Sequence, residues 1–424
     1  MESFESIKSV PGHGLLRESK LKVKGVMIPM LVQAKSVLRA LLFLMVTQTR
    51  SRSVANLKIL TSEILVEDDD SSETALFPAG LAICEPNFPI ATENGQTSFP
   101  QLKFRHLSGV RVTSNRRFSS VLQGDKLLLP GFVEPGPWKL HWGQPEVAGI
   151  LGQRGNEVLI RERRQAYSFP RGVFVGSVSP HNWYHWLIDT LPSVFLASAL
   201  PPQYSQFPLL IPEVALTKPS WLEVLELLEH GREIVPLPTN RYLEFEDLVW
   251  IDSPTTPGPI AQARYREAKY SLHAEAMSAF RFRMLNQLSI DESGISASRK
   301  LYMARKQDGN RPYNQTELIS VATRFGYEAI YFDDLSILET AIIMLETKNL
   351  IGPHGAGWAS AIFLKEGMEG AMWTWPEGLA DNWFSNIARL RNLNFHVLLT
   401  TGTEPKANNL DPLLLEKYLS QNYS

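Results

Sequence analysis

Strands and helices alternate at short intervals between residues 300 and 399, and this alternation limits the fold more than any other feature of the sequence. Short apolar runs predict the strands, and the amphipathic segments between them predict the helices. The expected strands are 300–304, 329–332, 349–352, 371–375 and 396–399, and the expected helices are 315–325, 335–345, 356–363 and 383–392. Strand, helix and strand at this spacing predict a parallel, doubly wound sheet.

The middle of the chain carries a looser version of the same pattern. Strands are expected at 127–130, 158–160, 173–178, 209–211 and 248–251, and helices at 221–230 and 261–286. We therefore predict an α/β protein with two Rossmann-like, doubly wound lobes, over residues 75–290 and 291–424. Ligands of open α/β sheets bind outside the carboxyl ends of the strands, so we expect the functional site in the cleft between the lobes.

Residues 1–74 differ from the rest of the chain. Their first 52 residues carry nine Lys and Arg against three acidic residues, and an acidic run follows at 67–72. The most apolar stretch, 26–46, is interrupted by Pro29, Lys35 and Arg39, which argues against both a transmembrane helix and a signal peptide. We predict a basic N-terminal arm closed by an acidic linker. The arm would either lie on a membrane surface or dock on the protein itself.

Composition limits the partners and the compartment. The chain holds 42 basic and 44 acidic residues, a net charge of −2, so we expect no nucleic-acid partner. A single cysteine, Cys84, excludes an intramolecular disulfide and a zinc finger, and favours a reducing compartment. We therefore expect a cytoplasmic protein, with membrane association through the arm left open.

A helix is expected directly after the strand at 173–178. Ser179 is a suitable N-cap residue, Pro180 fits the first helical position, and Pro192 should end the helix. This placement puts the start of the helix at the carboxyl end of a strand, where ligands of α/β sheets bind.

Three ionisable residues recur along this helix at every fourth position: His181, His185 and Asp189. At that spacing they share one face, where two imidazoles and a carboxylate could form a general base with an orienting partner. Either His185 or Asp189 could be the base, with His181 orienting. We favour His185, because a deeper Asp189 would fix the tautomer and orientation of the imidazole.

A glycine-rich turn after the strand at 349–352 is the second candidate site. It contains His354, Gly355, Ala356 and Gly357 and leads into a helix. Glycines allow a ligand to approach the backbone, and the helix would direct its free N–H groups toward an anion. The turn is therefore a candidate phosphate site, with His354 available to a phosphate or a sugar hydroxyl.

Three cations form the third candidate site. Arg305 and Lys306 stand at the carboxyl end of the strand at 300–304, and Arg311 follows in the next loop. Guanidinium groups chelate two phosphate oxygens at once, so these side chains could hold a diphosphate without a metal ion. A solvated basic loop is the alternative.

Together these segments resemble glycosyltransferase family 61. Residues 181–189 are similar to that family's H-N-[YWF]-[YF]-H-W-x-x-D motif, and residues 352–357 to its G-x-H-G-A-G motif. Tyr302 to Arg305, with Arg311, is similar to its strand-arginine stretch. The resemblance covers roughly residues 173–399. The chain departs from the family at Ala304 and at 358–360.

The resemblance implies an inverting enzyme of the GT-B type, with two lobes facing across a cleft and a role in polysaccharide biosynthesis. A nucleotide-sugar donor would bind the C-terminal lobe, and a glycan or glycoconjugate acceptor mainly the N-terminal lobe. We expect no cofactor and no metal ion. The best Asp-rich alternatives are Asp68 to Asp70 in the linker and Asp333-Asp334, where capping of the next helix explains the carboxylates.

Two other functions are carried as alternatives. His181, His185 and Asp189 could ligate a metal ion in a hydrolase, although no Glu follows the first histidine. The chain could also be a non-catalytic carbohydrate-binding protein that stacks sugars on its tryptophans. The tryptophans near the motifs are Trp183, Trp186, Trp373, Trp375 and Trp383.

Overall fold

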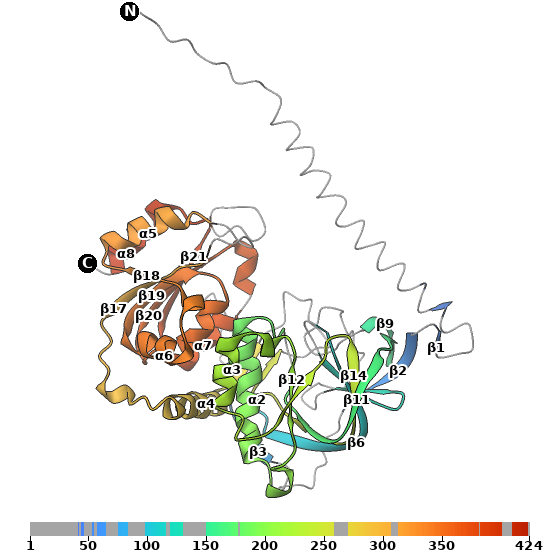
Figure 1. Ribbon diagram of the computed structural model, residues 1–424. Coiled ribbons are helices and arrows are strands. Elements are labelled where there is room, and N and C mark those ends of the chain that lie inside the picture. The colour runs from blue at the N-terminus through green and yellow to red at the C-terminus, as the bar shows by residue number, and fades with distance from the viewer. Residues whose placement is uncertain are drawn as a thin grey trace, which may run out of the picture.

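The computed structural model describes residues 41, 44–45, 53–54, 57–64, 75–83, 98–115, 119–129, 150–176, 179–257, 270–306, 313–380, 382–400 and 409–422. These residues form three sheets, of twelve, four and five strands, with helices packed around them (Figure 1). The mixed α/β class predicted from the sequence is confirmed. In the described part of the chain, no helix is long and apolar enough to cross a membrane.

The five-stranded sheet is parallel throughout, in the order β18-β17-β19-β20-β21. Its strands are β17 (Arg299–Met303), β18 (Glu328–Ile330), β19 (Thr347–Pro353), β20 (Glu369–Thr374) and β21 (Asn394–Leu399). Helices α5 (Gln315–Arg324) and α8 (Pro412–Asn422) lie on one side, and α6 (Ile337–Glu346) and α7 (Trp383–Leu390) on the other (Figure 1). This is the doubly wound sheet that the alternation predicts.

Successive residues of these strands enter two different cores, because side chains alternate across a sheet. In β17, Leu301 and Met303 join the core under α6, while Tyr302 joins the core under α5 and α8. Residues 356–363 form a 3-10 helix, Ala356–Phe363, on the α6 side, where the sequence predicts a helix.

The twelve-stranded sheet is mixed. Its strands are β1 (Ser53–Val54), β2 (Leu57–Ile64), β3 (Ala75–Phe77), β6 (Leu102–Ser114), β7 (Ser119–Gln123), β8 (Lys126–Leu129), β9 (Ile150–Arg154), β10 (Glu157–Arg161), β11 (Arg164–Phe174), β12 (Leu209–Pro212), β13 (Ile234–Leu237) and β14 (Arg241–Ile251). Neighbours in the run β13-β12-β11-β14 are parallel. From β14 to β6 and beyond, pairing is antiparallel except between β2 and β8.

The prediction of a doubly wound parallel sheet is therefore wrong for most of this region. Two-residue turns explain the difference, because they join neighbouring strands directly into antiparallel hairpins. Gly124-Asp125 joins β7 to β8 and Gly155-Asn156 joins β9 to β10, and both glycines have positive φ values of 55° and 57°. Strand β2 lies beside β8 and β10, inside the segment predicted as an arm and linker. Residues 1–40, the acidic run at 67–72 and Cys84 lie outside the described residues.

Helices from the middle of the chain pack against the C-terminal part. They are α2 (Leu191–Leu196), α3 (Pro219–Glu226) and α4 (Ala274–Gln287). Phe280 of α4 shares one buried core with Ile362, and the Arg281 Nε donates to the carbonyl of Ile362 at 2.9 Å. Helix α4 begins later than the predicted 261–286, because strand β16 (Tyr270–His273) precedes it and pairs with β4 (Gly80–Ile83) and β15 (Thr255–Pro257).

Candidate active site

The segment after β11 turns before it becomes helical. The side chain of Asn182 accepts a hydrogen bond from the Tyr184 N–H at 2.9 Å, and its carbonyl accepts one from the Trp186 N–H at 3.0 Å. Asn182 thus caps the helix, whereas Ser179 has a positive φ of 39° in the preceding turn. The prediction of a helix beginning at Pro180 is wrong, and His181 lies in the turn with an exposed side chain instead of on the stripe of His185.

The helix then widens into a π-helix, His185–Thr190. The Leu191 N–H bonds to the carbonyl of Trp186, five residues back, and the Thr190 hydroxyl donates to the carbonyl of His185. Pro192 does not end the helix as predicted, and the helix continues from the π-helical turn into α2. The ordinary i to i−4 hydrogen-bond pattern is already interrupted at this turn, so the missing N–H of the proline costs little. Single π-helical turns are rare and often occur at functional sites.

His185 and Asp189 form a buried hydrogen-bonded pair on this turn. The His185 Nδ1 lies 2.6 Å from the Asp189 Oδ2, and the side chains are 9% and 3% exposed. The other carboxylate oxygen, Oδ1, accepts a hydrogen bond from the Thr255 hydroxyl at 2.8 Å. Both oxygens of Asp189 therefore have protein partners, while the His185 Nε2 forms no hydrogen bond with any described residue.

Aromatic rings enclose the pair. The rings of Tyr184 and Trp383 each lie edge-on to His185, with centroids 5.5 Å away. Burial, with Asp189 nearby, raises the pKa of Tyr184 well above its usual value, so its phenol stays neutral. The Tyr184 hydroxyl donates to the carbonyl of Trp383 at 3.3 Å. The Tyr184 and Trp383 rings also stack on each other, with centroids 5.8 Å apart, so the imidazole packs against a pair of aromatic rings.

The glycine turn lies at the carboxyl end of β19, and Arg305 lies against it. The Arg305 Nη2 donates to the carbonyl of His354, and the guanidinium occupies the space where a side chain at Gly355 would begin. Gln315 holds the backbone of Arg305 by two hydrogen bonds, from Arg305 N at 2.7 Å and to Arg305 O at 2.9 Å. Gly355 therefore makes room for a cation of the protein itself.

The other glycines of the turn have a packing role. A Cβ on Gly357 would lie 2.7 Å from the Met303 Sδ, and one on Gly352 would lie 2.7 Å from the Met303 Cβ. These close approaches hold the turn against β17. Ala356 and Gly357 remain partly exposed at the start of the 3-10 helix.

The other residues predicted to bind the sugar donor have different surroundings. The His354 ring is buried, with Trp375 and Phe384 edge-on at centroid distances of 4.9 Å. Lys306 is exposed and forms an ion pair with Asp334. Arg311 lies outside the described residues. Asp334 does not cap α6 as predicted, because Ser336 caps it, in a capping box with Glu339.

The beginning of α7 connects the two histidines. Trp383 contacts His185, and the next residue, Phe384, contacts His354. A hydrogen bond from the Trp183 Nε1 to the Ser360 Oγ, at 3.3 Å, also joins the first motif to the 3-10 helix that follows the glycine turn. Segments that are about 170 residues apart in the sequence thus form one site.

Two further residues at the site, Thr255 and Lys218, carry no signal in the sequence. Thr255 is 66 residues from Asp189 and belongs to no motif, so only the fold shows their contact. The Lys218 Nζ donates to the carbonyl of His181 at 3.1 Å and lies 3.7 Å above the Trp221 ring. Partial burial lowers the pKa of Lys218, while nearby Asp333 opposes this effect.

The structure also places the residues on which the two alternative functions, a metal-dependent hydrolase and a carbohydrate-binding protein, depend. In the described ranges, no group of three or more His, Cys, Asp or Glu side chains is arranged to hold a metal ion, and His181 lies apart from the buried pair. Trp186 and Trp373 are fully buried core residues. Trp183, Trp375 and Trp383 are partly buried and contact the site.

Residues 183–370 match the family model described as Glycosyltransferase 61. The match begins inside the motif at 181–189 and includes β17 and the glycine turn, so the resemblance is confirmed over this span. A search of curated proteins found no match. The chain therefore contains a region that is similar to glycosyltransferase family 61.

Proposed function

Proceeding from this glycosyltransferase 61 region, we propose that the protein is an inverting, metal-independent glycosyltransferase of the GT-B type. It would move a sugar from a nucleotide-sugar donor to a hydroxyl group of a glycan or glycoconjugate acceptor. The observation that carries this proposal is the His185–Asp189–Thr255 arrangement, which leaves one ring nitrogen of a buried histidine available.

His185 is the proposed general base. With Asp189 ionised and accepting from Nδ1–H and from Thr255, the lone pair of His185 lies on Nε2. This nitrogen takes the proton of the acceptor hydroxyl as the oxygen attacks the anomeric carbon. Asp189 then stabilises the imidazolium that forms. The alternative, Asp189 as base, would require the acceptor hydroxyl to reach a carboxylate that is only 3% exposed and already accepts two hydrogen bonds.

Departure of the nucleoside diphosphate needs positive charge near the anomeric carbon. As the new bond to the acceptor oxygen forms, the bond between the anomeric carbon and the phosphate oxygen breaks, and negative charge grows on the diphosphate. Arg305 is the best-placed cation, since its backbone is held by Gln315 and its guanidinium lies at Gly355. Lys306, Arg311 and the N–H groups at Ala356 and Gly357 would assist.

The role of His354 is to position Arg305. Its ring is packed between Trp375 and Phe384, and its carbonyl accepts the Arg305 hydrogen bond. The turn therefore aims the guanidinium, while the imidazole orders the turn. This differs from the direct contact with a phosphate or sugar hydroxyl expected from the sequence.

A ligand screen followed by product analysis tests this function. Nucleoside diphosphates and nucleotide-sugars are screened by thermal shift with and without EDTA, since a ligand that binds only the native state raises its stability. We expect stabilisation that EDTA does not abolish. The stabilising nucleotide-sugar is then incubated with acceptor hydroxyl compounds, and NMR of the product should show an inverted anomeric configuration. A strict need for Mg²⁺ or Mn²⁺, or retained configuration, would contradict the proposal.

A further inference from the structure

The amide side chain of Gln315, at the start of α5, lies against the backbone of Arg305. Its Oε1 accepts a hydrogen bond from the Arg305 N–H at 2.7 Å, and its Nε2 donates to the Arg305 carbonyl at 2.9 Å. Gln315 is buried, with 4% of its surface exposed. One side chain therefore satisfies both backbone groups of the residue that is the best-placed cation of the proposed donor site.

The backbone of Arg305 needs this partner because its strand ends before it. Strand β17 ends at Met303, and the Ala304 N–H still bonds to the carbonyl of Ile330, in β18, at 2.8 Å. Beyond this point the Gln315 amide lies where the peptide group of a neighbouring strand would lie, with a donor and an acceptor facing one residue. The side chain thus extends the edge of the sheet by one residue.

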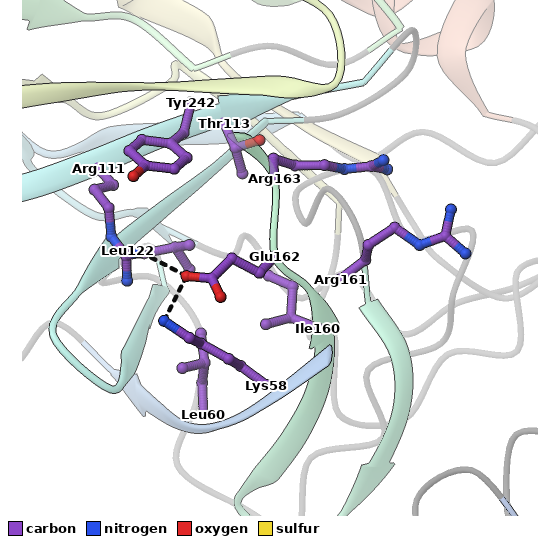
Figure 2. A pocket seen from close by; sticks show the side chains of 10 residues that line it. All are labelled: Lys58, Leu60, Arg111, Thr113, Leu122, Ile160, Arg161, Glu162, Arg163 and Tyr242. Atoms are coloured by element: carbon purple, nitrogen blue, oxygen red, sulfur yellow. Dashed lines mark ion pairs between the residues drawn. The ribbon is translucent and has the colours of Figure 1, made fainter. Parts of the chain in front are cut away.

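Arg111 of β6 shows how the protein holds an arginine inside a strand. Its backbone pairs with β7 on one side and with β14 on the other. Its guanidinium forms an ion pair with Glu162 at 3.5 Å and lies over the Tyr242 ring at 5.4 Å (Figure 2). Strand pairing fixes this backbone without a side chain, so a contact such as that of Gln315 is needed only where the strand has ended.

Tyr313 orients the Gln315 amide. The Tyr313 hydroxyl donates to the Gln315 Oε1 at 2.5 Å, and the Tyr302 hydroxyl donates to the Tyr313 oxygen at 3.4 Å. Burial raises the pKa of Tyr313 to about 12, so its phenol stays protonated and remains a donor. The Gln315 Oε1 therefore accepts two hydrogen bonds, and a flipped amide would direct its N–H groups at both donors. Only one orientation of the amide satisfies these contacts.

We propose that Gln315 is a positioning residue of the donor site, which acts by fixing Arg305 and is itself oriented by Tyr313. This inference rests on the proposed transferase function, because the effect of Gln315 is exerted on the diphosphate through Arg305. The Arg305 guanidinium bonds to the carbonyl of His354 and lies at Gly355, so a displaced Arg305 backbone would also displace the guanidinium. A side chain that is ordered before the donor arrives loses less conformational freedom on binding.

A double-mutant cycle between Gln315→Ala and Arg305→Ala tests the proposal on the full chain, with UDP and GDP titrated by calorimetry. Gln315→Ala should weaken binding about tenfold, because a loosened Arg305 must be ordered when the nucleotide binds. In the Arg305→Ala background the same change should weaken binding less than about twofold, since the amide acts only through the arginine. Equal losses in both backgrounds would overturn the proposal. A loss in Arg305→Ala with none in Gln315→Ala would overturn it too, and would leave the proposed function intact.

Two further variants separate positioning from a general loss of stability. Asn349→Ala removes another buried amide of the same sheet, which donates to the Glu369 Oε2 at 2.8 Å near the amino ends of β19 and β20. It should lower the unfolding temperature and change nucleotide affinity less than about twofold. Tyr313→Phe, which removes one hydroxyl, should weaken nucleotide binding about two- to threefold. Equal losses of affinity in Asn349→Ala and Gln315→Ala would make the role of Gln315 merely structural and overturn the proposal.

Hydrogen exchange gives a readout that needs no ligand. The Arg305 amide should exchange at least about tenfold faster in Gln315→Ala than in the unsubstituted protein, while the amides within β17 keep their rates. Mass spectrometry with fragmentation to single residues measures both. An unchanged rate at Arg305 would overturn the proposal whatever the protein binds. Faster exchange in a protein that binds neither UDP nor GDP would support the hold of Gln315 on Arg305 and count against the proposed donor site, so the two failures are distinguishable.

Discussion

The candidate active site has two sides that are built differently. On the π-helix side, His185 and Asp189 are buried, and Thr255 holds the second carboxylate oxygen. On the sheet side, Arg305 is partly buried at a strand end and Lys306 is exposed. The π-helix side fixes the geometry of the proposed base, and the sheet side supplies positive charge.

This difference predicts how each side contributes to catalysis. A buried base held by hydrogen bonds matters chiefly in the transition state, when the proton moves. Cations at a strand end act on the diphosphate both before and during its departure. Substitutions on the π-helix side should therefore lower kcat with nucleotide affinity intact, and substitutions on the sheet side should change both quantities.

The largest expected effect is that of His185→Ala. Removal of the base should slow transfer by about 10²–10⁴-fold, the usual contribution of general base catalysis, while nucleotide binding stays intact. Steady-state rates and calorimetry with the nucleoside diphosphate check both halves of this prediction. His181→Ala, in the exposed turn of the same segment, is the control and should keep its rate. Loss of nucleotide binding in His185→Ala would show that the helix is structural.

Arg305→Ala should have the second-largest effect on transfer. Loss of a cation beside the growing charge should cost about 2–4 kcal/mol in kcat/KM, and donor binding should weaken as well. Arg324→Ala, an arginine of α5 paired with Glu416, is the charge-matched control. An unchanged rate in Arg305→Ala would remove this residue from the site and with it the distinction between the two sides.

Asp189→Asn sharpens the assignment of the base. If Asp189 only orients His185, the variant should lose about 10–10²-fold in kcat, a part of the effect of general base catalysis, and keep a measurable rate. Rates of the two variants at equal nucleotide saturation provide the comparison. An inactive Asp189→Asn with a merely slowed His185→Ala would assign the base to Asp189.

The sheet side was predictable from the sequence almost element by element. Strand and helix follow each other locally there, and each strand end carries its own functional residue, as Arg305 does after β17 and His354 after β19. The π-helix side was predictable only in part. The motif contains His185 and Asp189, but the cap at Asn182 moves His181 off the helix, and the Thr255 contact depends on the fold.

The antiparallel strand directions of the twelve-stranded sheet were not predicted, for a related reason. The Gly-Asp and Gly-Asn pairs at 124–125 and 155–156 are hairpin signals that favour antiparallel pairing, and apolar runs alone do not reveal strand direction. The position of Arg305 over Gly355 could not be predicted from the sequence either. The sequence does not distinguish a glycine that faces a ligand from one that faces a side chain.

Thr255→Val should have a smaller effect than the three changes above. It keeps the shape of the side chain but leaves the Asp189 Oδ1 without its donor, which should destabilise the protein by about 1–3 kcal/mol. The rate should fall only a few-fold, because the His185 hydrogen bond remains. Thermal unfolding and kcat give the two values, and Thr217→Val, with its exposed hydroxyl, is the control. Unchanged stability and rate together would mean that Thr255 does not hold the carboxylate.

Lys306 should show the smallest effect, and it gives the sharpest test of the sheet side. Its ion pair with Asp334 is about half exposed, and such pairs contribute less than about 1 kcal/mol to stability. Lys306→Ala should therefore weaken nucleotide binding only a few-fold, and added salt should shrink the difference because exposed charges are screened. Calorimetry with the nucleoside diphosphate at two salt concentrations measures this.

Asp334→Asn is the companion change, because it removes a carboxylate that pairs with the Lys306 ammonium. If Lys306 turns to the diphosphate when the donor binds, Asp334→Asn should tighten nucleotide binding, while Lys306→Ala loosens it. The double variant should then resemble Lys306→Ala, since the carboxylate acts only through the lysine. No change in either single variant would remove Lys306 from the cations that act on the diphosphate. A loss in Lys306→Ala as large as that in Arg305→Ala, and equally insensitive to salt, would instead show that an exposed cation matters as much as the one held at Gly355.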